Sequence, residues 1–522
     1  MNSRARPSIV RKDNTVSEAL DPVLTVDGRG PLPRARWGAF IGGQWVVPDD
    51  AAWFAVLEPA TGGHLAEVMA ADQDLVDLAV RDSRRAYEGE WGRLTPRDRG
   101  ALLRKAAAAI REHADELGEL EAREVGKPRR DALRFDISFS SAGFDYFGGL
   151  ADTLHGELLD QGAIEARVHY EPYGVVAAIL PFNWPPLHFT KKSAPALAAG
   201  NTVVVKPGEQ APLAVLRLVE IVNQVLPPGV VNAVAGLPAG SALSGHPVVE
   251  RITFTGATAT GQHVLRSAAE NLTYATLELG GKNALMVLDD ADMGTAVDVA
   301  IEGMFYNQGE ACTSTSRILV HRSHHDEFVE RFVAATAKLT VGDGLDAATD
   351  IGAMVDAKQQ RKVLGYIDTA VAEGAKIAFQ GQAPADERLR DGFWVPPTVL
   401  VGVEPHHTVA QEEIFGPVAS LLVFDTDDEA VGIANGTSYG LTAAIITEDH
   451  FRASRLAERL QAGMIFVNNY MRRSFLGSPF GGVKGSGFGR ENWSETLHEF
   501  VRAKNVRFPS GRAPVPVWPP VD

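Results

Sequence analysis

Cys312, the only cysteine of the chain, stands in the segment NQGEACT at residues 307–313. An apolar stretch with helical spacing precedes it at residues 300–305, and Gly309 interrupts that pattern. A thiol held in a loop among backbone N–H groups can be stabilised as a thiolate, the nucleophilic form of cysteine. Free cysteine is also among the most buried residues, so a small buried hydrophobic side chain is the alternative. Taken by itself, the segment favours that alternative.

Two polar side chains lie at the ends of apolar runs that predict buried strands. Glu278 ends the run at residues 274–279, where burial could raise its pKa and make it a general base. Asn183 follows the run at residues 175–180, in the turn PFNWP, where its amide could donate to a developing oxyanion. The carboxyl ends of parallel strands are where α/β sheets place their sites. A solvated strand end and a plain aromatic turn are the alternatives.

Two further turns could hold a phosphate-bearing ligand. Residues 256–261, GATATG, lie between a predicted strand and a predicted helix, as a phosphate-binding turn does. They lack the middle glycine of GxGxxG, so this motif alone is weak and packing of small residues is the alternative. Lys206 and Glu209 follow another predicted strand and could hydrogen-bond a ribose, although a plain charged turn would look the same.

Short, continuous apolar runs surround these candidates and are typical of parallel strands buried on both faces. Helical segments separate the strands, which implies βαβ units and doubly wound sheets. The first series of predicted strands comprises residues 175–180, 202–205, 230–234, 251–254 and 274–279. The second comprises residues 284–288, 318–321, 418–424, 442–447 and 464–467. The predicted fold class is therefore α/β with two doubly wound domains.

The remaining stretches predict a helical region and a small sheet. Residues 41–150 begin with a short β-like stretch and then become helical, with Thr95 as N-cap and Pro96 at the first helical position. Residues 154–172 and 497–508 look extended and fit neither strand series. We expect these two stretches to pair with each other as a separate sheet.

The composition narrows the classes of partner. The chain has 522 residues, of which 45% are hydrophobic and 22% charged, as in a globular protein of several domains. Its net charge of −16 repels phosphate backbones and anionic lipids, which argues against nucleic-acid and membrane partners. The N-terminal residues lack the apolar segment of a secretory signal. One cysteine and scattered histidines predict neither a disulfide nor a metal site, and they fit a reducing cytoplasm.

Taken together and in this order, the motifs resemble the aldehyde dehydrogenase superfamily, of the NAD(P)-dependent, hydrolytic type. The resemblance extends over roughly residues 38–505. Its most specific blocks are EEIFGP at residues 412–417 and PFGGVKGSGFGRE at residues 479–491.

This resemblance implies a covalent mechanism. Cys312 would attack the aldehyde and form a thiohemiacetal, which splits a difficult oxidation into two easier steps. The Asn183 amide and the backbone N–H of Cys312 would hold the oxyanion. NAD would accept a hydride to leave a thioester, and Glu278 would activate the water that hydrolyses it.

The resemblance also implies which residues bind the cofactor. They are Pro181, Trp184, Lys206, Glu209, Gly256, Thr258, Gly261, Leu279, Glu413 and Phe415. The Glu209 carboxylate can accept hydrogen bonds from a free ribose 2′-hydroxyl and would repel a 2′-phosphate. NAD is therefore expected over NADP, although Lys206 could weaken this preference.

The implied substrate pocket comprises Trp184, His188, Thr313, Met471, Arg472 and Phe480. Arg472 and Arg473, with Lys191, could recruit an aldehyde that bears a carboxylate, since arginine binds carboxylates in bidentate fashion. Outward-facing arginines are the favoured alternative. Trp184 and Met471 suit an aliphatic or aromatic aldehyde equally well.

Two positions depart from the pattern of the family. Ala257 stands where serine is frequent, so one hydrogen bond to the pyrophosphate could be absent. Glu310 stands where glutamine is more usual, two residues before the nucleophile. A carboxylate there would raise the pKa of the thiol unless it points away from it.

The resemblance divides the chain into four parts. They are an N-terminal extension (1–37), a NAD-binding domain (38–153 and 173–280), a catalytic domain (281–485) and a bridging segment (154–172 and 486–522). In the family this bridging sheet joins subunits, so a homodimer or homotetramer is expected, with a small-molecule aldehyde as substrate.

Two rival functions remain at this point. A CoA-acylating aldehyde dehydrogenase would pass the acyl group to a thiol, and the presence of Glu278 as a base for water argues against it. A catalytically silent NAD-binding structural member is the other rival. The presence of Cys312, Glu278 and Asn183 together argues against a silent protein.

Overall fold

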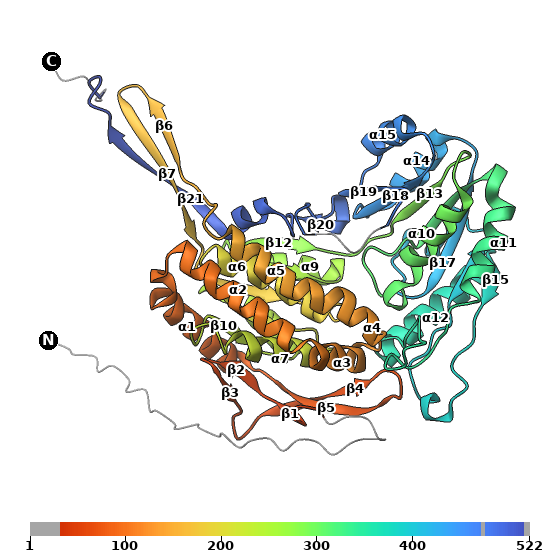
Figure 1. Ribbon diagram of the computed structural model, residues 1–522, viewed down its shortest axis with the longest axis horizontal. Coiled ribbons are helices and arrows are strands. Elements are labelled where there is room, and N and C mark those ends of the chain that lie inside the picture. The colour runs from red at the N-terminus through yellow and green to blue at the C-terminus, as the bar shows by residue number, and fades with distance from the viewer. Residues whose placement is uncertain (1–31, 471–475, 516–522) are drawn as a thin grey trace.

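In the computed structural model, which describes residues 32–470 and 476–515, two large β-sheets lie next to each other (Figure 1). One has eight strands and the other seven, and helices pack on both faces of each. Most strand pairs within the two sheets are parallel. The predicted α/β fold class is confirmed.

The eight-stranded sheet has the order β20-β12-β11-β8-β9-β10-β2-β3. Its parallel strands are β8 (Val175–Ile179), β9 (Thr202–Lys206), β10 (Val231–Ala233), β11 (Val249–Thr255) and β12 (Tyr274–Glu278). These match the first predicted series to within a few residues. Antiparallel strands extend both edges, β2 (Ala39–Ile41) and β3 (Gln44–Val46) at one, β20 (Gly487–Phe488) at the other.

Alternate residues of the central strands enter two cores. Val176 and Val203 pack against α6 (Pro185–Ala198) and α7 (Leu213–Val222), whereas Val175 and Val204 pack on the other face. That other face is covered by α1 (Gln73–Glu88), α8 (Leu237–Ser244) and α9 (Thr258–Glu270). A second helical layer lies outside α6 and α7 and comprises α2 (Pro96–Glu112), α3 (Ala114–Val125) and α5 (Ser138–Leu150).

Helix boundaries in this layer follow the sequence signals. The Thr95 hydroxyl accepts a hydrogen bond from the Asp98 N–H at 3.2 Å, as predicted for an N-cap. Gly126 ends α3 with a φ of 89°, a left-handed conformation that glycine adopts without strain. Between α3 and α5 lie the short α4 (Arg129–Asp131) and a π-helical turn (Ala132–Ile137) that no sequence signal predicted.

The seven-stranded sheet has the order β15-β16-β17-β14-β13-β18-β19. Its strands are β13 (Ala284–Val287), β14 (Arg317–His321), β15 (Lys376–Gln380), β16 (Thr398–Val401), β17 (Val418–Phe424), β18 (Thr442–Ile446) and β19 (Met464–Val467). Helices α10 (Met293–Phe305) and α11 (His325–Thr336) cover one face. Helices α12 (Ala357–Ala372), α14 (Asp427–Asn435) and α15 (His450–Arg459) cover the other, and α13 is a single turn (Thr408–Gln411).

Two three-stranded sheets complete the described fold. The two extended stretches do pair: β7 (Ile164–Pro172) lies between β6 (Glu157–Gln161) and β21 (Val501–Pro509), all antiparallel. Figure 1 shows these strands projecting from the body as an arm. The other sheet, β1 (Arg36–Trp37), β5 (Gly63–Ala70) and β4 (Ala52–Glu58), was not predicted.

Two further observations bear on the sequence predictions. Gly487–Phe488 pairs with β12, so the predicted bridging segment 486–522 begins with a strand of the eight-stranded sheet instead. The positive φ of Gly487 and of Gly489 turns the chain into and out of this short pairing. Within the described ranges, no helix combines the length and the apolar character needed to span a membrane.

Candidate active site

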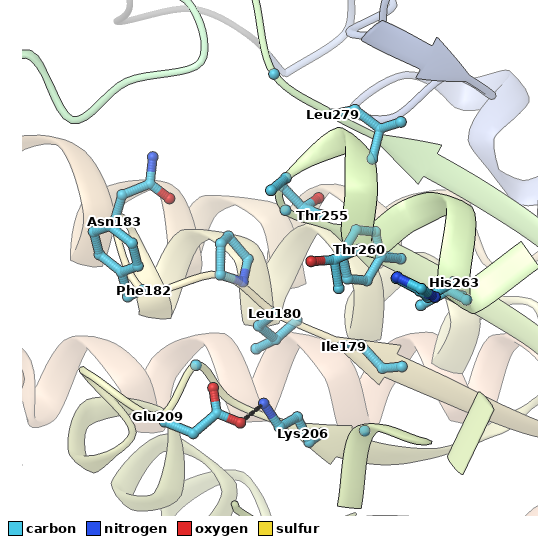
Figure 2. Close-up of a pocket in the computed structure, with 18 of the residues that line it drawn as sticks. Ile179, Leu180, Phe182, Asn183, Lys206, Glu209, Thr255, Thr260, His263 and Leu279 are labelled. Atoms are coloured by element: carbon cyan, nitrogen blue, oxygen red, sulfur yellow. Dashed lines mark hydrogen bonds and ion pairs between the residues drawn. The ribbon is translucent and has the colours of Figure 1, made fainter. Parts of the chain in front are cut away.

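A long cleft runs along the carboxyl ends of β8, β9, β11 and β12 and is closed from the other side by α12 and the segment after α13. It encloses about 1550 Å³ of empty space, part of it open to solvent (Figure 2). A smaller pocket of about 360 Å³, here called the aromatic pocket, has walls that include Phe135, Phe139, Trp184 and Phe480. Cys312 lines both, so its thiol lies where the long cleft and the aromatic pocket meet.

The backbone before Cys312 is held in an unusual conformation. Asn307 and Gln308 have φ values of 55° and 46°, and Gly309 one of 71°. A Cβ at Gly309 would lie 2.4 Å from the Gly416 carbonyl oxygen, so only glycine fits there. The Asn283 side-chain amide donates to the carbonyl of Cys312 at 2.8 Å. The position of the thiol is therefore fixed by packing and hydrogen bonds from distant segments.

The Asn183 side chain is oriented by the same loop. It is buried, and its Nδ2 donates to the Glu310 carbonyl oxygen at 2.9 Å. A carbonyl can only accept, so this bond decides which way the amide faces. The amide nitrogen carries a second hydrogen, and Asn183 lines the long cleft beside Cys312. An oxygen bound near the thiol can therefore receive a preoriented hydrogen bond.

Glu278 lies at the end of β12 but turns away from the thiol. Its carboxylate is beside Gly481, where Oε1 lies 2.8 Å from the position a Cβ would take, and it lines neither cavity. Burial, reinforced by the negative charge of Glu491, raises the pKa of Glu278 well above that of an ordinary glutamate, against the pull of Lys191 and Lys192. Glu278 thus holds its proton more firmly than an ordinary glutamate and must rotate to reach Cys312.

Glu491 forms ion pairs with two buried lysines. Its Oε1 accepts from Lys192 Nζ at 2.8 Å, and its Oε2 lies 3.1 Å from Lys191 Nζ. Burial opposes ionisation of Glu491, but the two ammonium groups outweigh it and lower the pKa of this carboxyl. The two lysines therefore hold Glu491 ionised, whereas burial and the charge of Glu491 disfavour ionisation of Glu278.

The Glu310 carboxylate points away from the Cys312 thiol. Its Oε1 accepts from the Val355 N–H at 3.2 Å, its Oε2 accepts from Gln308 Nε2 at 3.1 Å, and the side chain lines neither cavity. Burial raises the pKa of Glu310 to about 8. The carboxyl group thus turns into the protein and is mostly neutral at pH 7, so it places little negative charge beside the thiol.

Seven of the ten predicted cofactor residues line the long cleft. They are Pro181, Lys206, Glu209, Gly256, Leu279, Glu413 and Phe415. Trp184 lies in the aromatic pocket instead, because its ring packs against Phe135. Thr258 donates its hydroxyl to the Gly485 carbonyl at 3.3 Å. Gly261 is a packing position, since a Cβ there would lie 2.6 Å from a methyl carbon of Leu279.

The N-terminus of α9 opens onto the long cleft. Its N-cap is Ala257, whose side chain cannot accept a hydrogen bond, and both Ala257 and Thr260 line the cleft. The first N–H groups of a helix attract an anion such as a pyrophosphate. Figure 2 shows Lys206 and Glu209 joined by an ion pair farther along the same wall. These donors and acceptors fit a dinucleotide.

The opposite wall of the cleft depends on residues that no motif marked. Gln359 Nε2 donates to the Phe415 carbonyl at 2.7 Å and holds Phe415 at a φ of 62°, with its ring edge-on to that of Phe182. Glu413 accepts from the Gly281 N–H at 2.9 Å. Lys362, from the same helix as Gln359, also lines the cleft.

Four predicted substrate residues, Trp184, His188, Thr313 and Phe480, line the aromatic pocket. Met471 and Arg472 lie outside the described residues. Lys191, which was expected near the substrate, lines the pocket as well, and four further lining residues were not predicted as pocket members: Phe135, Phe139, Leu187 and Asn492. Phe135 and Phe139 come from the π-helical turn and α5, far from every motif in the sequence.

Comparison with known proteins relates most of the chain to a single family. The model of the aldehyde dehydrogenase family matches residues 45–506. Aldehyde dehydrogenase citD of Monascus ruber is 48% identical over 477 residues, which cover 91% of this chain and 95% of that protein. Betaine aldehyde dehydrogenase of Vibrio vulnificus strain CMCP6 is 40% identical over 470 residues, covering 90% and 96%.

Solved structures agree with these relatives. The NAD+ complex of an aldehyde dehydrogenase from Bacillus cereus superposes with a TM-score of 0.88 at 37% identity, covering 91% of this chain and 97% of that one. Betaine aldehyde dehydrogenase of Staphylococcus aureus in complex with NAD+ superposes with a TM-score of 0.89 at 36% identity, covering 93% and 97%.

Proposed function

The chain belongs to the aldehyde dehydrogenase family and is an NAD-dependent aldehyde dehydrogenase, and we propose that it uses Cys312, Asn183 and Glu278 to oxidise an aldehyde to the carboxylic acid. The observation that supports this proposal most strongly is the position of Cys312 at the junction of two cavities. The long cleft fits the cofactor, and the aromatic pocket leads the aldehyde to the thiol from the other side.

In the first step the Cys312 thiolate attacks the carbonyl carbon and forms a C–S bond. The carbonyl oxygen gains the electron pair and becomes an oxyanion. The second N–H of the Asn183 amide and the backbone N–H of Cys312 stabilise that charge. Donors that are already oriented act strongly here because they need no reorganisation when the charge develops.

When bound, NAD supplies the acceptor for the hydride that the thiohemiacetal loses on becoming a thioester. Residues of the long cleft would hold it: the N-terminus of α9 would bind the pyrophosphate, and Glu413 and Phe415 would bind the nicotinamide end. Glu209 accepts from the adenine-ribose hydroxyls and repels a 2′-phosphate, which favours NAD over NADP.

Hydrolysis of the thioester completes the cycle. Glu278 rotates from Gly481 toward Cys312 and takes a proton from water, whose oxygen attacks the acyl carbon. The C–S bond breaks, the carboxylic acid leaves, and Cys312 is released as a thiolate. Because burial raises the pKa of Glu278, it is a stronger base than an ordinary carboxylate once ionised.

The test is NADH formation by the purified chain with NAD and a panel of aldehydes, beside Cys312→Ala. We expect NADH with the wild-type chain and none above background with the variant. Formation of acyl-CoA on addition of CoA would favour the acylating rival. Binding of NAD without any NADH would favour the silent rival.

We also propose that the chain assembles as a homodimer or homotetramer in the cytoplasm. The arm formed by β6, β7 and β21 supports assembly, since the outer edges of β6 and β21 pair with no further strand among the described residues and Leu158 on β6 is 66% exposed. A thiol nucleophile also needs a reducing compartment. Light scattering of the purified chain should give a mass of two or four subunits, and a monomer would contradict the proposal.

A further inference from the structure

The walls of the aromatic pocket are built from flat side chains. Phe135 makes edge contacts with Trp184 at 6.2 Å and lies 6.5 Å from Phe139. Phe480 lines the pocket as well. Aromatic rings prefer edge-to-face and offset contacts with other rings, so these walls suit a flat, unsaturated ligand more than a bulky aliphatic one.

Three polar side chains of this pocket have no hydrogen-bond partner in the part of the chain that the structure describes. They are His188 at both ring nitrogens, Asn492 at both amide atoms, and Trp184 at Nε1. His188 is 2% exposed and Asn492 is fully buried, so bulk water does not reach them freely. Buried polar groups are nearly always hydrogen-bonded, and a ligand that displaces the side chains now covering these atoms can supply the missing bonds.

The charge around the pocket is positive. Lys191 lines the pocket with its Nζ 3.4 Å from the centre of the Phe480 ring, and it shares Glu491 with Lys192. Two ammonium groups thus share one carboxylate, and burial disfavours ionisation of the second acid, Glu278, by raising its pKa. Burial and the nearby lysines lower the pKa of His188, so its ring is neutral and both donates and accepts.

This arrangement disfavours a cationic substrate. Recognition of a quaternary ammonium group relies on open aromatic faces. Here the face of Phe480 already carries the Lys191 ammonium, and no Asp or Glu is among the described residues that line the pocket. An oxygen that accepts hydrogen bonds is favoured instead by Lys191, His188, Asn492 and Trp184.

We propose, on the basis of the function proposed above, that the preferred substrates are aromatic aldehydes whose ring carries oxygen substituents, bound by His188 and Asn492. A hydroxyl or carbonyl group on the ring would satisfy the polar atoms while the ring itself packs between the aromatic walls. Cationic aliphatic aldehydes such as betaine aldehyde would be poor substrates, although relatives that bear that name are similar in sequence.

The experiment compares kcat/KM values of the full chain at saturating NAD. The central pair is 3,5-dihydroxybenzaldehyde and 3,5-dimethylbenzaldehyde, which have the same shape and differ in their hydrogen bonds. Meta hydroxyls are not conjugated with the carbonyl, so its reactivity changes little. A site that hydrogen-bonds a substrate group discriminates strongly against an analogue without it, and we expect a ratio of at least about 10. Betaine aldehyde and cyclohexanecarbaldehyde should rank below both.

A pair of variants then assigns the effect to the polar atoms. His188→Phe keeps a ring but removes both nitrogens, and it should lower the dihydroxy-to-dimethyl ratio by about tenfold. Phe139→Leu alters an apolar wall of the same pocket and should leave this ratio unchanged. The measured quantity is a ratio within one variant, so a general loss of activity cancels.

The outcomes separate the two proposals. A ratio near 1 in the wild-type chain, or betaine aldehyde as the best substrate, would overturn the assignment of the substrate class while the dehydrogenase function stands. NADH formation with none of the aldehydes would overturn the proposed function itself. The wild-type comparison decides the matter even if His188→Phe does not fold.

Discussion

Three buried carboxyl groups near Cys312 differ in charge because of the groups that face them. Glu491 faces two ammonium groups and stays ionised. Glu310 faces a backbone N–H and an amide, which do not compensate for its burial. Glu278 has no hydrogen-bond donor among the described residues and lies near a negative charge. Residue type alone therefore does not identify the base, whereas the surroundings do.

Glu278→Gln should separate hydride transfer from hydrolysis. Glutamine has nearly the same shape but cannot take a proton from water. We expect one equivalent of NADH per active site in a rapid burst, followed by turnover slowed by about 10²–10⁴-fold. Stopped-flow measurement of NADH would show the burst.

The pH profile gives a second measure of the same residue. Burial raises the pKa of Glu278, so the ionised base forms only above the usual range of a carboxyl. In the wild-type chain, kcat should rise with pH above the usual range of a carboxyl group, under conditions where hydrolysis is limiting. This rise should be absent in Glu278→Gln, and an unchanged kcat in that variant would rule out Glu278 as the base.

Glu310→Gln should change how stability depends on pH. The pKa of Glu310 is raised by burial to about 8 in the folded chain, above its value in the unfolded chain. Between these two values the folded state binds one more proton, so the wild type loses stability as pH rises. Relative to Glu310→Gln, the wild type should lose about 2 kcal/mol between pH 6 and pH 8, since one pKa unit corresponds to about 1.4 kcal/mol.

Urea unfolding of both proteins at the two pH values measures this difference. In Glu310→Gln, the new glutamine amide can donate to Oε1 of Gln308, which has no hydrogen-bond partner in the described structure. The exposed Glu112 serves as the control, since Glu112→Gln removes a carboxylate that is not buried. An equal difference in both variants would show that burial of Glu310 is not its cause.

At the scale of elements, the turn between α10 and Cys312 holds three successive residues at positive φ. Gly309→Ala would place a methyl group 2.4 Å from the Gly416 carbonyl at a φ of 71°. We expect a loss of about 2–4 kcal/mol of stability and of most activity, because the turn must move and carries Cys312 with it.

Gly365→Ala is the matched control for this substitution. Gly365 lies inside α12, and a Cβ there meets nothing within 4 Å. Alanine should stabilise the helix by about 1 kcal/mol and leave activity unchanged. Thermal unfolding and NADH assays compare the two variants, and similar effects of both would contradict the steric account.

The sequence predicted those elements that are apolar throughout. Strands such as β8, β9 and β13 are buried on both faces and therefore appear as continuous apolar runs. The edge strand β15 reads KIAFQ and is mostly exposed, so it has no such run. The strands β4 and β5 mix exposed and buried positions, although β4 reads AWFAVLE and is apolar along most of its length.

The site was predictable where a motif carries it and not elsewhere. Cys312, Asn183 and the turn at Gly256 lie at strand or helix ends that the sequence marks. Gln359 and Lys362 belong to a helix whose pattern shows only which face is buried in its own domain core. The packing of the two large sheets decides which exposed helix face closes the cleft. No local sequence pattern encodes this packing.

At the scale of the whole molecule, the long cleft joins residues of both large sheets. Glu209 and Thr260 come from the eight-stranded side, whereas Gln359 and Glu413 come from the seven-stranded side. A ligand that binds only the folded chain stabilises it by RT ln(1 + [L]/Kd), about 2.7 kcal/mol at 100 times Kd. NAD should therefore raise the unfolding temperature of both halves together.

Differential scanning calorimetry with and without NAD tests this expectation. A single transition that shifts as a whole is the expected result. A shift confined to one of two separate transitions would show that the cofactor contacts only one side of the cleft.

Synthesis of the chain on a ribosome runs from the N-terminus, and Glu491 emerges about 300 residues after the two lysines that it neutralises. The same late segment supplies Phe480 to the aromatic pocket and Gly481 beside Glu278. A nascent chain that ends before this segment would have to bury two ammonium groups without their counter-ion, which is unfavourable. Newly made protein should thus remain inert until translation has passed residue 491.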